Sequence, residues 1–187
     1  MSEPAERMTR VDNAWLRMDN DVNLMMIVGV WLLQPALRYR QVCQRIEQQL
    51  LQYPRFRQKV VEDVLGASWV QDEDFDITRH VVRETLPRLR SQRGQGERAA
   101  LQARCGELAT TRLDPAQALW QFHLVEHYEG GSAIIVRIHH CIGDGIALTS
   151  VVLSITDGGA LLPRRSHDAV HDEGDWLTTT LIRPLTD

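Results

Sequence analysis

The sequence contains few cysteines and carries no large excess of charge of either sign. Its three cysteines, Cys43, Cys105 and Cys141, are odd in number and widely spaced. They predict neither a disulfide framework nor a CxxC metal motif, so a reducing, cytoplasmic setting is expected. The formal net charge of −4 argues against a nucleic-acid-binding protein, which would normally present a strongly basic face.

Long apolar segments are also missing. The longest uncharged apolar run, residues 24–33, is about half the roughly 20 residues that a membrane-spanning helix needs. Residues 1–10 carry charges and no apolar stretch, so no secretory signal is expected. The sequence therefore predicts a protein that is not integral to a membrane, and peripheral attachment stays open.

The composition is ordinary for a globular protein. Of the 187 residues, 43% are apolar and 25% are charged, which suffices for one sizeable core. We expect residues 1–162 to form one lobe. Residues 163–187 show no clean periodicity and predict a linker-like tail.

Apolar spacing predicts the order of helices and strands. Residues 24–33 (LMMIVGVWLL) predict a buried strand, and residues 36–52 carry one apolar stripe at helical spacing. Residues 53–83 predict short extended pieces, and residues 88–96 predict a loop. The remaining elements are a helix near residues 101–112, strands over 120–126 and 133–139 joined by a Glu-Gly-Gly turn, and a helix over 146–155. Such an order is typical of an α/β or α+β fold.

The segment with most chemical information is residues 139–145 (HHCIGDG). His139 and His140 leave the end of a predicted buried strand, and an imidazole there can accept a proton near neutral pH. Gly143 and Gly145 allow a tight turn and leave room for a ligand. A structural interpretation stands beside this one, because Asp144 is also a common helix N-cap residue. Adjacent strand residues face opposite sides, so one of the two histidines is expected to point into the core.

These residues resemble the HHxxxDG signature of the CoA-dependent acyltransferase superfamily, which includes chloramphenicol acetyltransferase and peptide-synthetase condensation domains. The remainder is most similar to bacterial wax ester synthase/diacylglycerol acyltransferases. Four further segments carry the resemblance: residues 11–17 (VDNAWLR), 54–59 (PRFRQK), 75–81 (FDITRHV) with Leu86-Pro87, and 119–126 (LWQFHLVE). Two positions depart from the family pattern: Ala118 stands where the family usually has proline, and Gly143 where it commonly has a larger residue.

The resemblance implies a chloramphenicol-acetyltransferase-like lobe, in which helices flank a mixed sheet, and assigns roles to the motif. His140 would be the general base that takes a proton from an acceptor hydroxyl. His139 would support it, Asp144 would fix the loop by pairing with a basic residue, and Gly145 would keep the approach open. The implied substrates are acyl-CoA and a long-chain alcohol or diacylglycerol, with no metal or prosthetic group.

The resemblance also implies further partners. Family members carry a second lobe with an Asn-Asp motif, which this sequence lacks, so we expect the chain alone to be inactive or feeble without that lobe or a partner chain. Because both substrates are greasy, some apolar surface should meet a membrane or lipid droplet. The candidates for this surface are Trp15, Met18, Met25 and Met26, and core packing is the alternative for the last two.

Three other interpretations remain open at this stage. Residues 123–127 (HLVEH) fit a zinc pattern, but two histidines can share a metal only on a helix, and the period-2 spacing favours a strand. A condensation-type domain would share HHxxxDG, and a non-catalytic module could bind acyl-CoA or a partner lobe. Arg55, Arg57 and Lys59 are candidates for CoA phosphates or for a solvated face. The histidines that take an ordinary surface or hydrogen-bonded interpretation are His80, His167 and His171.

Overall fold

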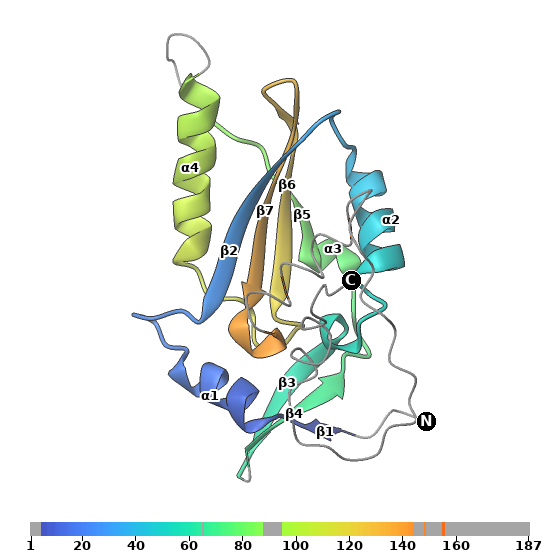
Figure 1. Ribbon diagram of the computed structural model, residues 1–187, viewed down its shortest axis with the longest axis vertical. Helices are drawn as coiled ribbons and strands as arrows, with labels where there is room; N and C mark the ends of the chain where they lie inside the picture. The colour runs from blue at the N-terminus through green and yellow to red at the C-terminus, as the bar shows by residue number, and fades with distance from the viewer. Residues whose placement is uncertain (1–4, 65, 88–94, 144–147, 149–154, 156–187) are drawn as a thin grey trace, which may run out of the picture.

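The structure is a computed structural model that describes residues 5–64, 66–87, 95–143, 148 and 155 (Figure 1). Its main feature is a four-stranded mixed sheet in the order β2-β7-β6-β5. The strands are β2 (Met26–Leu33), β5 (Val81–Arg83), β6 (Trp120–Tyr128) and β7 (Gly131–His139). Strand β7 pairs antiparallel with both β2 and β6, whereas β5 pairs parallel with β6.

A tight turn joins β6 to β7 and fixes their register. Glu129 and Gly130 both have positive φ, at 45° and 80°, as the central residues of a type I′ hairpin turn require. A Cβ atom on Gly131 would lie 2.2 Å from the carbonyl oxygen of Leu33, so only glycine fits where β7 begins beside β2. The turn predicted from the sequence is confirmed.

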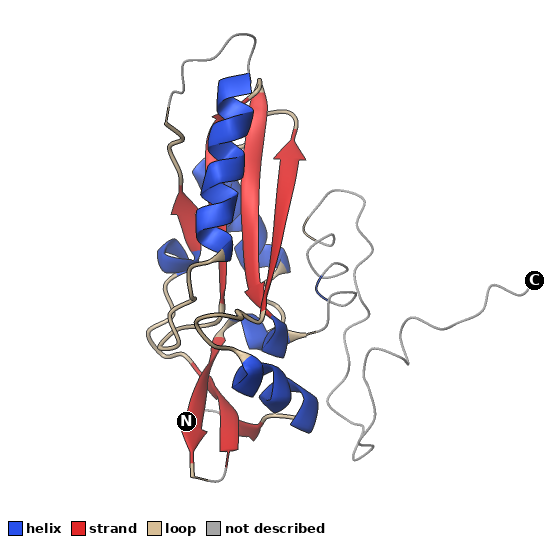
Figure 2. Ribbon diagram, turned by 90° about the vertical axis from the view of Figure 1, so that its left-hand side faces the viewer, coloured by secondary structure: helices blue, strands red, loops and turns tan. Residues whose placement is uncertain are grey.

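One helix covers each face of this sheet (Figures 1 and 2). Helix α2 (Tyr39–Gln49) buries Val42, Cys43 and Ile46 against one face. Helix α4 (Gln95–Ala109) packs Leu101 and Leu108 against the other, and Figure 2 shows it in front of the strands. The sheet is therefore the middle layer of three.

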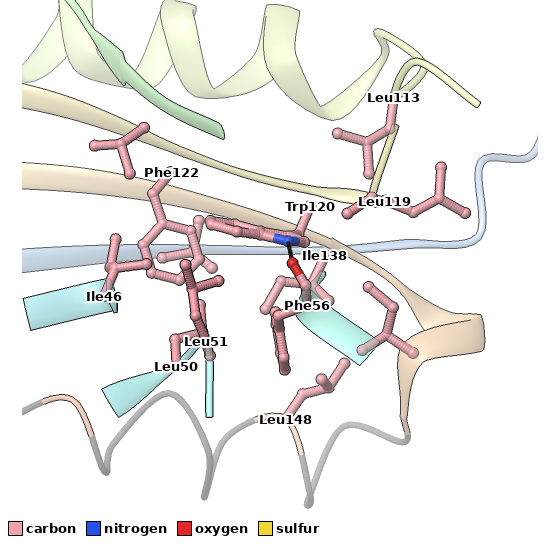
Figure 3. Close-up of a cluster of buried hydrophobic side chains, with 14 of the residues drawn as sticks. Ile46, Leu50, Leu51, Phe56, Leu113, Leu119, Trp120, Phe122, Ile138 and Leu148 are labelled. Carbon is pink, nitrogen blue, oxygen red and sulfur yellow. Dashed lines mark hydrogen bonds between the residues drawn. The ribbon is translucent and has the colours of Figure 1, made fainter. Parts of the chain in front are cut away.

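The larger core lies on the α2 face (Figure 3). Trp120 and Phe122 point from β6 into a cluster of aliphatic side chains, and the Trp120 Nε1 donates a hydrogen bond of 2.9 Å to the Phe56 carbonyl. Each large apolar side chain buried here contributes about 1.5–3 kcal/mol. The other labelled members are Ile46, Leu50, Leu51, Leu113, Leu119, Ile138 and Leu148.

A second, smaller sheet lies beyond one end of the first (Figure 1). Its strands are β1 (Glu6–Arg7), β3 (Gln58–Asp63) and β4 (Gly66–Gln71), in the order β1-β4-β3. Helix α1 (Arg10–Met18) and the 3-10 helix η2 (His140–Ile142) pack together at this end. The short helices η1 (Pro54–Phe56) and α3 (Ile77–His80) complete the described elements.

The mixed α/β fold expected from the sequence is confirmed, with some boundaries moved. The predicted first helix and hairpin form. The strand predicted over residues 24–33 also forms, as β2, but it is not buried as expected: it lies at the edge of the sheet, pairs only with β7 and has no fully buried residue. Helix α4 begins at Gln95, so the loop predicted over residues 88–96 is wrong at its last two positions. Residues 88–94, 163–187 and most of 146–155 lie outside the described residues. None of the described helices combines the length and apolar composition needed to cross a membrane.

Candidate active site

The second histidine of the motif stands at the end of β7, where the two sheets approach each other. The backbone N–H of His140 donates a 2.8 Å hydrogen bond to the Met25 carbonyl, one residue beyond the last β2–β7 pair. Its imidazole is half-buried and stacks on the indole of Trp15, with ring centroids 4.3 Å apart and planes 20° apart. The strand end thus fixes the backbone of His140, and α1 supplies a flat surface against its ring.

The first histidine lies inside the protein, as the sequence predicted for one of the pair. His139 is only 5% exposed, and its Nδ1 accepts a 3.1 Å hydrogen bond from the Cys141 N–H. Its Nε2 lies 3.7 Å from a carboxylate oxygen of Asp19, which is too long for a good hydrogen bond. Burial lowers the pKa of His139, and the nearby Asp19 carboxylate opposes this shift only in part. His139 is therefore a neutral, packed residue at pH 7.

Asp19 connects three segments around the two histidines. One of its oxygens accepts a 2.7 Å hydrogen bond from the Met25 N–H, at the entrance to β2. The other oxygen binds Arg112 at 2.6 Å, just after α4. The carboxylate is 12% exposed, so this contact is less screened than an ordinary surface ion pair. Asp19 thereby ties the end of α1 to β2 and to the segment that follows α4.

The other predicted site residues are only partly described. Gly143 has φ 173°, an extended backbone that any residue can adopt, so its conformation does not require glycine. Asp144 and Gly145 lie outside the described residues. The roles predicted for these three residues remain predictions.

A second polar cluster lies under α4 and is separate from the histidine pair. His123 Nδ1 is 2.7 Å from Glu84, and the same carboxylate binds Arg104 at 2.8 Å. Burial alone would raise the pKa of Glu84, but hydrogen bonds from Arg104 and His123 outweigh it, so its pKa lies below the usual value. His123 and His127 both lie on β6, which confirms the predicted strand and removes the helical spacing that the zinc pattern needs. Within the described ranges no three potential ligands gather in a way that could hold a metal.

The remaining candidate cations and histidines have structural partners. Arg55 binds Glu6 at 2.6 Å, and Lys59 binds Asp72 at 3.3 Å. His80 is buried, and its Nδ1 is 2.8 Å from the Trp120 carbonyl oxygen. Arg57 is exposed, whereas His167 and His171 lie outside the described residues.

Sequence reasoning missed the residues that hold the histidines. It placed Trp15 in the 11–17 segment of the family resemblance and gave it a role in lipid contact, yet this ring is half-buried against His140. It did not single out Asp19 at all. Neither residue carries a local signal, because the stack joins positions 125 residues apart (140 − 15) and the Asp19–Arg112 pair joins positions 93 apart.

Comparison with known proteins places this arrangement in a family. The profile of the wax ester synthase/diacylglycerol acyltransferase catalytic domain matches residues 8–173. The probable diacylglycerol O-acyltransferase tgs3 of Mycobacterium tuberculosis is 32% identical over 184 residues, a match that covers 94% of this chain and 65% of the relative. The chain thus spans just under two thirds of the length of that relative.

Solved structures share the fold at low sequence identity. The wax ester synthase/diacylglycerol acyltransferase of Marinobacter aquaeolei VT8 matches with a TM-score of 0.61 and 20% identity, over 79% of this chain and 36% of that one. A starter condensation domain of rhizomide synthetase in complex with C8-CoA matches with a TM-score of 0.60 and 15% identity, over 81% of this chain and 34% of that one. At these identities the two likenesses concern the fold alone. On the profile match, which covers most of its length, this chain belongs to the wax ester synthase/diacylglycerol acyltransferase catalytic domain family.

Proposed function

We propose that the chain is the histidine-bearing lobe of an acyl-CoA-dependent O-acyltransferase, with His140 as its general base. The observation that carries this proposal is the placement of His140: it ends a rigid strand, keeps its ring half-buried and belongs to the HH motif of a matching acyltransferase family. The acceptor would be a long-chain alcohol or diacylglycerol, because the family and the M. tuberculosis relative are named for these products or substrates.

The two ring nitrogens of His140 differ in their surroundings. Nδ1 is buried and has no hydrogen-bond partner among the described residues. A substrate that approaches from outside therefore meets Nε2, which we assign as the atom that accepts the proton. Because neutral imidazole carries one hydrogen, this assignment places it on Nδ1.

The proposed reaction is a proton-assisted acyl transfer. Nε2 accepts the proton of the acceptor hydroxyl as its oxygen bonds to the thioester carbonyl carbon. The tetrahedral intermediate then collapses and the C–S bond breaks. The imidazolium returns the proton to the departing CoA thiolate, and the imidazole is restored. General base catalysis of this kind contributes about 10²–10⁴-fold in rate. No metal or prosthetic group enters this scheme, because acyl-CoA is itself the activated substrate.

The proposal extends to the rest of the site. His139 would support the backbone of η2, Asp144 would fix the loop, and Gly143 and Gly145 would leave room for the substrates. Relatives are longer than this chain, so we propose that full activity needs the additional part, supplied as a second lobe or partner chain. Both substrates are apolar, which would place the active protein at a membrane or lipid-droplet surface.

The test is an acyl-transfer assay with radiolabelled palmitoyl-CoA and either hexadecanol or dioleoylglycerol. The chain is assayed alone and together with the complementary C-terminal part of the M. tuberculosis relative. We expect labelled ester, and a fall of about 10²–10⁴-fold for His140→Ala at unchanged thermal stability. Full activity of this variant would contradict the base assignment. Binding of palmitoyl-CoA without transfer under any condition would instead identify a non-catalytic binding module.

A further inference from the structure

The orientation of the His140 ring is not fixed by a hydrogen bond to any described residue. Functional histidines usually have one ring nitrogen bonded to a carboxylate or carbonyl, which sets the ring plane and the tautomer. In this protein Nδ1 of His140 is buried and has no such partner among the described residues. Among the described residues, packing is what restricts the orientation of this ring.

The packing surface is the indole of Trp15. The rings lie 4.3 Å apart at the centroids and 20° from parallel, which is a stacked arrangement. Such aromatic contacts contribute about 0.5–1.5 kcal/mol beyond the apolar area they bury. A stacked face also restricts rotation about the bond to the ring, because any large rotation drives the imidazole edge into the indole.

Trp15 can serve this purpose because α1 is anchored at both ends. Just before the helix, the Met8 N–H donates a 3.1 Å hydrogen bond to the Ala67 carbonyl in β4, and Met8 is buried in the main core. Beyond the helix end, Asp19 binds the Met25 N–H and Arg112. Between these anchors, Leu16 packs against the main core. The indole therefore projects from an element whose position is fixed relative to β2, the strand that also holds the His140 backbone.

We propose that Trp15 is a positioning residue, whose indole holds the imidazole of His140 in the orientation that presents Nε2 to the substrate. The geometric part of this inference stands on the stack alone, and its catalytic meaning rests on the proposed function. It replaces lipid contact as the role of Trp15, because one face of the indole is covered by His140 and the side chain is partly buried against the main core.

The first test is structural and needs no activity. In the unmodified chain, NMR should show nuclear Overhauser effects between the Trp15 indole protons and the His140 ring protons, with the latter shifted upfield by the indole ring current. Trp15→Phe should keep an upfield shift of the His140 ring protons and show Overhauser effects from the Phe ring protons to them. Trp15→Leu should lose the upfield shift. Absence of these effects in the unmodified chain overturns the positioning role, whether or not either variant folds.

The second test is kinetic and uses the acyl-transfer assay with the complementary part present. Trp15→Leu should lower kcat by on the order of 100-fold with little change in KM, because misplacing a reacting group costs rate rather than ground-state binding. Trp15→Phe should recover most of the lost rate. The control is Val42→Ala, which removes core packing from helix α2 rather than from α1 and should lower thermal stability while keeping kcat.

The outcomes separate the two proposals. If Trp15→Leu and Val42→Ala lose kcat in proportion to their losses of stability, Trp15 is only a packing residue and the positioning role is overturned. If the unmodified protein transfers no acyl group but shows the NMR signatures, the proposed function fails while the stack is upheld. If His140→Ala is inactive and Trp15→Leu is fully active, the proposed function holds and the positioning role fails.

Discussion

The two faces of the four-stranded sheet differ sharply in chemistry. On the α2 face, β6 and β7 present a continuous apolar surface that includes Trp120, Phe122 and Ile138. On the α4 face, the same strands present His123 and Arg137 among apolar neighbours, and all of these are buried. The alternation of strand side chains puts these two sets on opposite sides, so one hairpin serves both an apolar core and a polar one.

The two faces of the sheet contribute differently to the stability of the fold. The α2 face gains free energy mainly from buried apolar area. On the α4 face, Arg137 is 2% exposed and hydrogen-bonded to Gln121 and to the Thr111 carbonyl, and its Nε has no partner in the part of the chain that the structure describes. Burying such a cation offsets much of the gain from its hydrogen bonds. The hydrogen bonds of the polar face therefore fix the positions of the side chains and segments that they join more than they add to the net free energy of folding.

The largest effect is expected on the apolar face. Trp120→Ala should lower the free energy of unfolding by about 3–5 kcal/mol, because it opens a large cavity and leaves the Phe56 carbonyl without its donor. Urea denaturation followed by circular dichroism measures the change. A loss below about 0.5 kcal/mol, as an ordinary surface substitution causes, would show that this face is not the main source of stability.

The next effect concerns the carboxylate that joins the polar cluster. Glu84→Gln should cost about 2 kcal/mol, because it removes the charged acceptor of both His123 and Arg104. The matched control is Glu107→Gln, which removes a largely exposed partner of the same arginine and should cost under about 0.5 kcal/mol. Equal losses for the two variants would mean that burial of Glu84 adds nothing.

Acid should destabilise the fold through its buried histidines. Burial lowers the pKa values of His80, His123 and His139, so the folded state binds fewer protons than the unfolded state below about pH 6.5. Stability is then full above that pH and falls as the pH drops, by up to about 1.4 kcal/mol per pH unit for each histidine. Denaturation at pH 7 and pH 5.5 should show the loss. His123→Gln should reduce the slope, and an unchanged slope would exclude this histidine as a contributor.

The smallest effect is expected where the polar face meets the active site. Asp19→Asn should lower stability by about 1 kcal/mol, because its side chain binds Arg112 and the Met25 N–H while nearly buried. Asp21→Asn is the control, since Asp21 binds the same arginine but is 86% exposed. Thermal melts of both variants measure the two losses of stability. A larger loss for Asp21→Asn would show that the exposed Asp21, and not Asp19, is the more important partner of Arg112.

Local patterns in the sequence predicted the elements but not the contacts between them. The apolar run ending at Leu33 and the Glu129-Gly130 turn follow from short-range rules, and both form, but the run is a partly exposed edge strand rather than the buried strand that was predicted. The parallel pairing of β5 with β6 and the burial of Arg137 do not follow, because each depends on segments distant in sequence. Arginine is normally exposed, so composition gave no reason to place it under a helix.

The candidate site divides in the same way. The motif and the end of the apolar run predicted that two histidines leave a buried strand and that one points inward, as His139 does. Their neighbours could not be predicted, since Trp15 and Asp19 reach them only through the packing of α1 on η2. Residue type indicated the chemistry, and tertiary packing determined which residues hold it in place.

The hydrogen bond from His140 to Met25 makes the candidate active site depend on the position of strand β2 along the sheet. The bond continues the ladder just past the Met26–His139 pair, so the number of residues in β2 sets how far the imidazole reaches beyond the sheet. Removing two residues from β2 would preserve which side chains face inward yet shift the anchoring carbonyl by about 7 Å. Side-chain identity along β2 can thus drift within its apolar pattern, whereas its length cannot.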